Sequence, residues 1–224
     1  MAQLFEPPRY IAVEGPIRAG KSTLARLIAE RLRARLIEEP EGSPFLKRFY
    51  AGDPHAAFPA QMDFLVQRFE RLHAIDRESR APVVADYIFE KDKLFACINL
   101  SDQELRVYDA YYDMFRKQLA TPDLVIYLQA TPEALSKRVR RKNAPEEQEI
   151  AASYIEEVVR AYEHFFFHYT ASDLLVVNIN DLDFVDSDHD LAELLRRLEE
   201  PIRGPQYFLP LSATEEAKAE KARA

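Results

Sequence analysis

Residues 15–22 read GPIRAGKS, a glycine-rich loop that ends in a lysine and a serine. An apolar run at residues 10–13 precedes it, and apolar residues with helical spacing follow it over residues 24–32. Backbone N–H groups of such a loop can surround a phosphate chain, helped by the positive end of the next helix. Lys21 is suited to the β- and γ-phosphates and the Ser22 hydroxyl to Mg²⁺. The motif therefore predicts a nucleoside triphosphate site. Its residues are Gly15, Pro16, Ile17, Arg18, Ala19, Gly20, Lys21, Ser22 and Thr23.

Acidic residues follow two further apolar runs. Glu38 and Glu39 end the second run, and Pro40 then turns the chain away. A carboxylate there faces the crevice where ligands bind in open α/β sheets, and it could accept the proton of a substrate hydroxyl. Asp86 ends the run at residues 83–85, as in a strand whose aspartate holds Mg²⁺. The alternatives are a solvated strand end for the glutamates and a loop-capping aspartate.

A basic segment over residues 137–142 runs into a turn. Cations in a closing lid offset the negative charge of transferring phosphates, and Arg138 and Lys142 are the candidates for that role. The alternative is a solvated basic helix face. Because the segment follows the fourth apolar run, we favour the lid.

Composition narrows the class of protein. The chain has 224 residues, 47% of them hydrophobic, which predicts one globular domain with a sizeable core. A formal net charge of −8 disfavours a broad nucleic-acid or anionic-membrane surface. The single cysteine, Cys97, excludes an intrachain disulfide and is expected to be a small buried residue in a reducing compartment. With no signal-peptide pattern or membrane-length apolar run, we expect a cytoplasmic protein.

Short apolar runs alternate with long helical patterns along the chain, which predicts an α/β fold with a five-stranded parallel sheet covered by helices on both faces. The domain is expected to span residues 1–211, and residues 212–224 to be a disordered charged tail. The expected strands are Tyr10–Val13, Arg35–Ile37, Pro82–Ala85, Leu124–Leu128 and Leu174–Ile179. The expected helices are Lys21–Ala34, Phe45–Tyr50, Pro59–Ser79, Asp102–Leu119, Pro132–Arg141, Ala151–Tyr169 and Leu191–Leu198, with Ser101 and Thr131 as N-caps.

The order of these motifs resembles the deoxyribonucleoside kinase family, including its bacterial deoxyadenosine and deoxyguanosine kinases and deoxycytidine kinase. The resemblance covers the chain up to about Leu211. It rests on the P-loop, the Glu39-Pro40 pair, the helical stretch FPAQMDFLVQR at residues 58–68 and the lid-like residues 138–150. It implies a P-loop NTPase-type fold with a lid, ATP and Mg²⁺ as donor and metal, and a homodimer.

The resemblance also implies roles for single residues. Glu39 would be the base for the 5′-hydroxyl, while Ser22 and Asp86 would serve the metal. The residues implied to bind the nucleoside are Gln61, Arg68 and Asp92 at its base and Tyr50 and Glu147 at its 3′-hydroxyl.

The chain departs from the family pattern at a few positions. Tyr87 follows Asp86 where the family usually has arginine, and Arg18 stands where many members have glycine. The lid keeps Arg138 but has Lys142 and Ala144 where further arginines are common. Lysine lacks the bidentate fork of arginine, so we expect a geometrically looser phosphate clamp.

We therefore interpret the chain as an ATP-dependent deoxynucleoside kinase, with a purine substrate favoured over deoxycytidine. One alternative is a nucleoside monophosphate kinase similar to thymidylate kinase. Glu39 argues against it, because an anionic acceptor gains nothing from a neighbouring carboxylate. The other is a nucleotide-dependent regulatory or binding protein, which the missing arginine after Asp86 favours.

Overall fold

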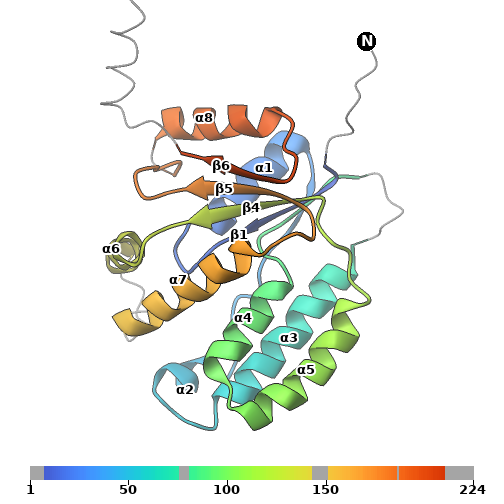
Figure 1. Cartoon of the computed structure of the whole chain (residues 1–224), viewed down its shortest axis with the longest axis vertical. Helices are drawn as coiled ribbons and strands as arrows, with labels where there is room; N and C mark the ends of the chain where they lie inside the picture. The colour runs from blue at the N-terminus through green and yellow to red at the C-terminus, as the bar shows by residue number, and fades with distance from the viewer. Residues whose placement is uncertain (1–7, 76–80, 143–150, 186, 210–224) are drawn as a thin grey trace, which may run out of the picture.

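In the part of the chain that the structure describes, six parallel strands form one sheet in the order β2-β3-β1-β4-β5-β6 (Figure 1). The structure is a computed structural model that describes residues 8–75, 81–142, 151–185 and 187–209. The strands are β1 (Tyr10–Glu14), β2 (Arg35–Ile37), β3 (Val83–Ala85), β4 (Leu124–Gln129), β5 (Asp173–Asn178) and β6 (Pro205–Phe208). Because all six run in the same direction, their carboxyl ends lie at one edge. Glu14 at the end of β1, Glu39 after β2 and Asp86 after β3 are all placed at that edge.

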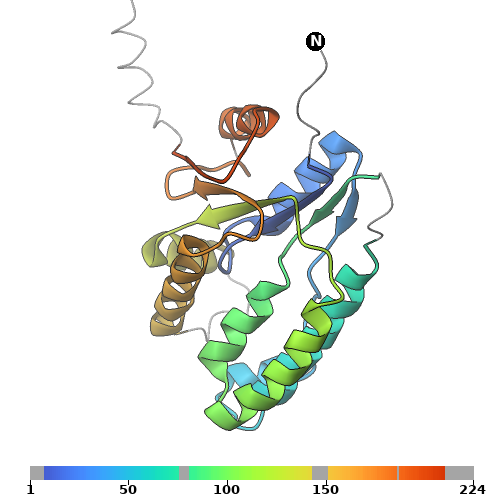
Figure 2. The ribbon, with the colours of Figure 1, turned by 45° about the vertical axis from the view of Figure 1, so that its right-hand side comes forward.

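Helices cover both faces of the sheet. Figures 1 and 2 show α1 and α8 on one face and the layer of α3, α4, α5 and α7 on the other. The helices are α1 (Lys21–Leu32), α2 (Leu46–Tyr50), α3 (Ala57–His73), α4 (Glu90–Asn99), α5 (Asp102–Arg116), α6 (Pro132–Lys142), α7 (Ala152–Phe167) and α8 (Asp188–Glu199).

Alternate residues of β1 serve two cores. Ile11 and Val13 pack in the cluster that includes α1 and α8, while Tyr10 and Ala12 pack in the cluster that includes α3 and α5. This two-residue period is the geometry of a strand covered on both faces. The sheet is therefore a rigid base for the loops that leave its carboxyl edge.

The predicted α/β fold is confirmed, and each predicted strand is present to within one residue at each end. The predicted number of five strands is wrong by one. The added strand, β6, begins at Pro205, lies at the edge of the sheet and alternates exposed with half-buried residues, so it lacks a continuous apolar run.

One helix was missed. Residues 86–101 contain no glycine or proline, so the start of α4 at Glu90 carries no breaker signal, and only Leu100 and Ser101 separate it from α5. Ser101 forms the predicted cap as a full capping box with Glu104. The predicted tail at residues 212–224 lies outside the described residues.

Two further expectations concern the surface. Cys97 is exposed on α4, so the expectation that it is buried is wrong. Within the described residues, no helix is both long and apolar enough to cross a membrane.

Candidate active site

The loop at residues 15–20 joins β1 to α1 at the carboxyl edge of the sheet. Its turn is closed by a hydrogen bond from the Ala19 N–H to the carbonyl of Pro16, and Lys21 Nζ donates to the same carbonyl at 3.1 Å. Burial, followed by the charge of Lys91, lowers the pKa of Lys21. Gly20 adopts φ 96° and Arg18 φ 60°, in the left-handed region that favours glycine. Because residue 18 has a positive φ, glycine would suit this position. The arginine side chain there costs about 1–2 kcal/mol of backbone strain.

Glu14 holds this loop in place through hydrogen bonds. Its buried carboxylate accepts hydrogen bonds from the N–H groups of Gly15 (2.8 Å) and Ile88 (3.0 Å) and from the hydroxyl of Tyr162 (3.0 Å). One side chain thus joins the P-loop to the chain after β3 and to α7.

Asp86 lies directly beyond β3, buried and next to Ser22. Burial raises the pKa of Asp86 to about 6, although the hydrogen bond from Ser22 opposes the shift. Among the described residues, the buried Oδ1 atom of Asp86 has no hydrogen-bond partner. A carboxylate oxygen without a partner beside a hydroxyl is the donor set that Mg²⁺ prefers, so these two residues fit the metal.

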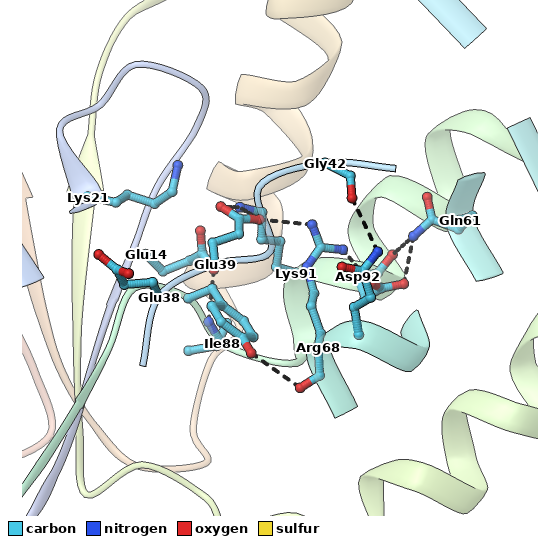
Figure 3. Close-up of polar contacts among 12 residues, drawn as sticks. Glu14, Lys21, Glu38, Glu39, Gly42, Gln61, Arg68, Ile88, Lys91 and Asp92 are labelled. Carbon is cyan, nitrogen blue, oxygen red and sulfur yellow. Dashed lines mark hydrogen bonds and ion pairs between the residues drawn. The ribbon is translucent and has the colours of Figure 1, made fainter. Parts of the chain in front are cut away.

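Glu39 follows β2 and lies between two cations (Figure 3). Its carboxylate contacts Lys91 Nζ at 2.6 and 2.7 Å and Arg68 Nη2 at 2.9 Å. The Glu39 side chain is 23% exposed, whereas those of Lys91 and Arg68 are each 6% exposed. Burial alone would raise the pKa of Glu39, but the charges of Lys91, Arg68 and Lys21 outweigh it and hold that pKa well below its usual range.

Asp92 collects three donors in the interior. Arg68 Nη1 forms an ion pair with Asp92 Oδ2, while Gln61 Nε2 (2.6 Å) and the Tyr108 hydroxyl (2.7 Å) donate to Oδ1. Gln61 Nε2 also donates to the Asp92 carbonyl at 3.0 Å. The amide oxygen of Gln61 is therefore left pointing away from Asp92 (Figure 3). Arg68 connects this group to Glu39.

Two clefts meet at Lys21 and Glu39. The first lies over α2, α3, α4 and α7, and its lining includes Tyr50, Gln61, Phe64 and Arg68. The second lies over the P-loop, and its lining includes Gly20, Ser22, Thr23 and Arg138. Ile17, Lys21 and Glu39 line both clefts. Two bound molecules would therefore face each other across Glu39 and Lys21.

Arg138 of α6 contacts the P-loop. It donates to the carbonyls of Ala19 (3.2 Å), Ile179 (2.8 Å) and Leu182 (3.1 Å), and burial lowers its pKa. It lines the second cleft but is not among the contacts of Glu39. The side chain of Lys142, and Glu147 with the rest of residues 143–150, lie outside the described part of the chain.

The sequence did not single out Glu14, Lys91, Tyr108 or Tyr162 as members of the site. Glu14 carries a signal, because an acidic residue ends an otherwise apolar strand. Lys91 and Tyr108 lie on α4 and α5, and without α4 nothing in the sequence placed Lys91 beside Glu39.

Comparisons with known proteins agree on one family. A family model described as deoxynucleoside kinase matches residues 11–203. The deoxyguanosine kinase of Bacillus subtilis (strain 168) is 31% identical over 201 residues, which covers 86% of this chain and 97% of that protein. The deoxyadenosine/deoxycytidine kinase of the same organism is 26% identical, over 88% of this chain and 94% of its own length.

Solved structures show the same fold. A deoxyadenosine kinase from M. mycoides with bound dATP aligns with a TM-score of 0.72 at 23% identity, covering 85% of this chain and 100% of that one. The same enzyme with products dCMP and a flexible dCDP aligns with a TM-score of 0.71.

Proposed function

This chain belongs to the deoxynucleoside kinase family and transfers a phosphoryl group to a deoxynucleoside, and from that premise we propose that ATP is the donor and the 5′-hydroxyl the acceptor. The observation that carries this assignment is the meeting of the two clefts at Glu39 and Lys21. A donor phosphate chain held over the P-loop then faces a hydroxyl held beside Glu39. Phosphoryl transfer requires this positioning more than it requires covalent chemistry from the protein.

Glu39 is the proposed proton acceptor. A base must be ionised and within hydrogen-bond reach of the hydroxyl that it activates. Lys91 and Arg68 keep Glu39 ionised, and its partial exposure opens it to the first cleft. As the acceptor oxygen bonds to the γ-phosphorus, its proton moves to Glu39, and the electron pair of the breaking P–O bond stays on the departing diphosphate.

The loop amides of residues 15–23 and Lys21 are proposed to bind the triphosphate. Ser22 and the unpartnered oxygen of Asp86 would hold Mg²⁺, which when bound neutralises part of the phosphate charge. Arg138 is proposed to stabilise the transferring group after it leaves the carbonyls that it contacts here, together with Lys142.

Gln61 and Arg68 are proposed to read the base of the nucleoside. The amide oxygen of Gln61, which points away from Asp92, can accept from a base N–H. The buried Nε of Arg68, which has no partner among the described residues, can donate to a base oxygen or nitrogen. Asp92 holds both side chains in place. We propose a purine deoxynucleoside, in line with the deoxyguanosine and deoxyadenosine kinases among the relatives.

Tyr50 in the first cleft, together with Glu147, is proposed to hold the sugar 3′-hydroxyl. We also propose a homodimer that works in the cytoplasm. The lone cysteine agrees with a reducing compartment. An exposed apolar row on α5, formed by Val107, Tyr111 and Met114, offers the dimer a contact surface.

The decisive test uses two neighbouring glutamates. The wild type, Glu39→Gln and Glu38→Gln are each incubated with ATP, Mg²⁺ and one of the four deoxynucleosides, and 5′-monophosphate is followed. Glu38 is the matched control, because its side chain is 60% exposed and pairs with Arg26 on the surface. We expect Glu39→Gln to lose most turnover while ATP still binds, and Glu38→Gln to keep it.

Two outcomes would contradict the proposal. Equal turnover by Glu39→Gln and the wild type would remove Glu39 as the base. Phosphorylation of deoxynucleoside monophosphates in place of all four deoxynucleosides would give the chain a different acceptor.

A further inference from the structure

Lys91 lies at the centre of the proposed reaction site without a role in the mechanism described above. Its ammonium group contacts both carboxylate oxygens of Glu39, at 2.6 and 2.7 Å (Figure 3). The side chain is 6% exposed, and its Nζ lies over the ring of Phe95, 5.9 Å from the ring centroid. Lys91 lines the first cleft together with Lys21 and Glu39.

Burying an ammonium group costs free energy, so the presence of a lysine at position 91 needs a physical reason. A buried ion pair adds little stability beyond what well-packed apolar residues would give. α4 is held without it, since Gln61 and Arg68 already join Asp92 of α4 to α3. Packing alone therefore does not account for a lysine at this position.

The chain carries no cation directly after Asp86. The residue there is Tyr87, which is fully buried and donates its hydroxyl hydrogen bond to the carbonyl of Arg68. Lys91, four residues after Tyr87 and within α4, instead brings a positive charge to the carboxylate of Glu39.

Distance places this charge at the reacting oxygen. A hydroxyl that donates to Glu39 lies about 2.7 Å from the carboxylate oxygen. Because Lys91 Nζ contacts both of those oxygens, the hydroxyl oxygen lies no more than about 5.4 Å from the ammonium nitrogen. When Glu39 takes the proton it loses its charge, and Lys91 loses its anionic partner just as negative charge gathers on the transferring group.

We propose that Lys91 is a catalytic residue of this kinase, which shifts its pairing from Glu39 to the transferring phosphoryl group as the acceptor proton moves to Glu39. The inference rests on the proposed function. Lys91 stays an ammonium group throughout: the acceptor O–H bond breaks, its proton goes to Glu39, the O–P bond forms, and the diphosphate leaves with the electron pair of the old P–O bond.

The test compares Lys91→Gln with Lys91→Arg and with Lys93→Gln. Lys93 is the matched control, because it lies on the same helix and pairs with Asp109 of α5, away from Glu39. We expect Lys91→Gln to lower kcat by about 10²–10³-fold, the effect of removing one donor that stabilises a transition state, with KM for the deoxynucleoside changed less than about threefold. Lys91→Arg is expected to recover most of kcat, and Lys93→Gln to match the wild type.

A pH profile separates this role from a structural one. Glu39 faces Lys91 of α4, Arg68 of α3, Lys21 of α1, Asp86 after β3 and Tyr162 of α7. Without the Lys91 charge the pKa of Glu39 rises, so the acidic limb of kcat is expected to move to higher pH in Lys91→Gln and to stay in place in Lys93→Gln.

If Lys91→Gln fails to fold because Glu39 loses a partner, the double variant Glu39→Gln/Lys91→Gln removes both charges. We expect the double variant to be at least about tenfold slower than Glu39→Gln alone. In Glu39→Gln, Lys91 is still present and still acts on the phosphoryl group. Equal rates, or a kcat of Lys91→Gln within threefold of the wild type, would overturn the inference. If the wild type phosphorylates no deoxynucleoside at all, the proposed function fails instead.

Discussion

Arg68 Nη2 lies 2.9 Å from Oε1 of Glu39, so the residue proposed to read the base also holds the residue proposed to activate the hydroxyl. The other terminal nitrogen of the same guanidinium, Nη1, pairs with Asp92. One guanidinium group therefore connects Asp92 in the interior to Glu39 at the meeting point of the two clefts. Pairing with Asp92 and Glu39 outweighs burial and raises the pKa of Arg68, which keeps this link charged.

The depressed pKa of Glu39 makes stability depend on pH. A carboxyl whose pKa is lower in the folded state stabilises the protein above its unfolded pKa of about 4.3, and that contribution is lost as the pH falls toward the folded value. We expect thermal melts to show the largest Tm gap between the wild type and Glu39→Gln at pH 7, with the gap narrowing below about pH 4. Glu38→Gln is expected to show a small gap throughout. A Glu39→Gln gap that is unchanged from pH 7 to pH 3 would contradict the prediction.

The sequence predicted much of the sheet because each inner strand is a continuous apolar run buried on both faces. It missed β6 because an edge strand needs no such run, and it missed α4 because no glycine or proline marks its start. Residue types and strand ends were sufficient to single out Lys21, Glu39 and Asp86.

Contacts between distant segments were beyond sequence reasoning. Lys91 is 52 residues from Glu39, and Tyr162 is 148 residues from Glu14. Such pairs are set by the packing of α4 and α7 against the sheet, which periodicity alone does not specify. The sequence could therefore name candidates in the cleft but could not show that Arg68 links Asp92 to Glu39.

Asp92 is expected to be a stability determinant as well as a positioning residue. Asp92→Ala leaves Arg68 with one of its two partners and a buried Tyr108 hydroxyl without its acceptor. Removing one partner of a buried pair costs about 3–5 kcal/mol, which urea unfolding would measure. Asp109→Ala is the control, because its pair with Lys93 is partly exposed and should contribute at most about 1 kcal/mol.

The same Asp92 variant should also change specificity. With Gln61 released from Asp92, we expect KM for the preferred deoxynucleoside to rise. We also expect its kcat/KM to fall relative to the kcat/KM values of the other three deoxynucleosides. A variant that is destabilised but keeps its base preference would limit Asp92 to a structural role.

Gly20 is expected to tolerate no side chain. Its φ is 96°, and an added Cβ would lie 2.8 Å from Cζ of Phe184. Gly52 is the matched control, since its φ is 80° and nothing lies within 4 Å of an added Cβ. Gly52→Ala should cost the backbone strain alone, about 1–2 kcal/mol, and Gly20→Ala about 1–3 kcal/mol more by urea unfolding.

The ATP affinities of Gly20→Ala and Gly52→Ala should follow the same order as their stabilities. Gly20→Ala moves the loop amides and should weaken ATP binding in calorimetry, whereas Gly52→Ala should not. Adding Phe184→Ala makes room for the methyl group and should remove the excess stability cost. If the two glycine variants unfold alike, the contact with Phe184 is not the constraint.

The proposed homodimer can be tested on α5. Val107, Tyr111 and Met114 recur at helical spacing and are 46–49% exposed, on the helix at the outer edge of the layer below the sheet (Figures 1 and 2). A row of large apolar side chains facing solvent is explained if a second copy covers it. Tyr111→Glu would place a carboxylate in that contact and should convert dimer to monomer in light scattering at micromolar concentration.

Phe167→Glu is the control, because Phe167 is 79% exposed on α7, a different helix from α5. It introduces the same charge at an exposed aromatic residue and should leave the dimer intact. Tyr111→Glu should also retain kinase turnover, since Tyr111 does not line either cleft. Loss of the dimer in Phe167→Glu but not in Tyr111→Glu would move the interface from α5 to α7.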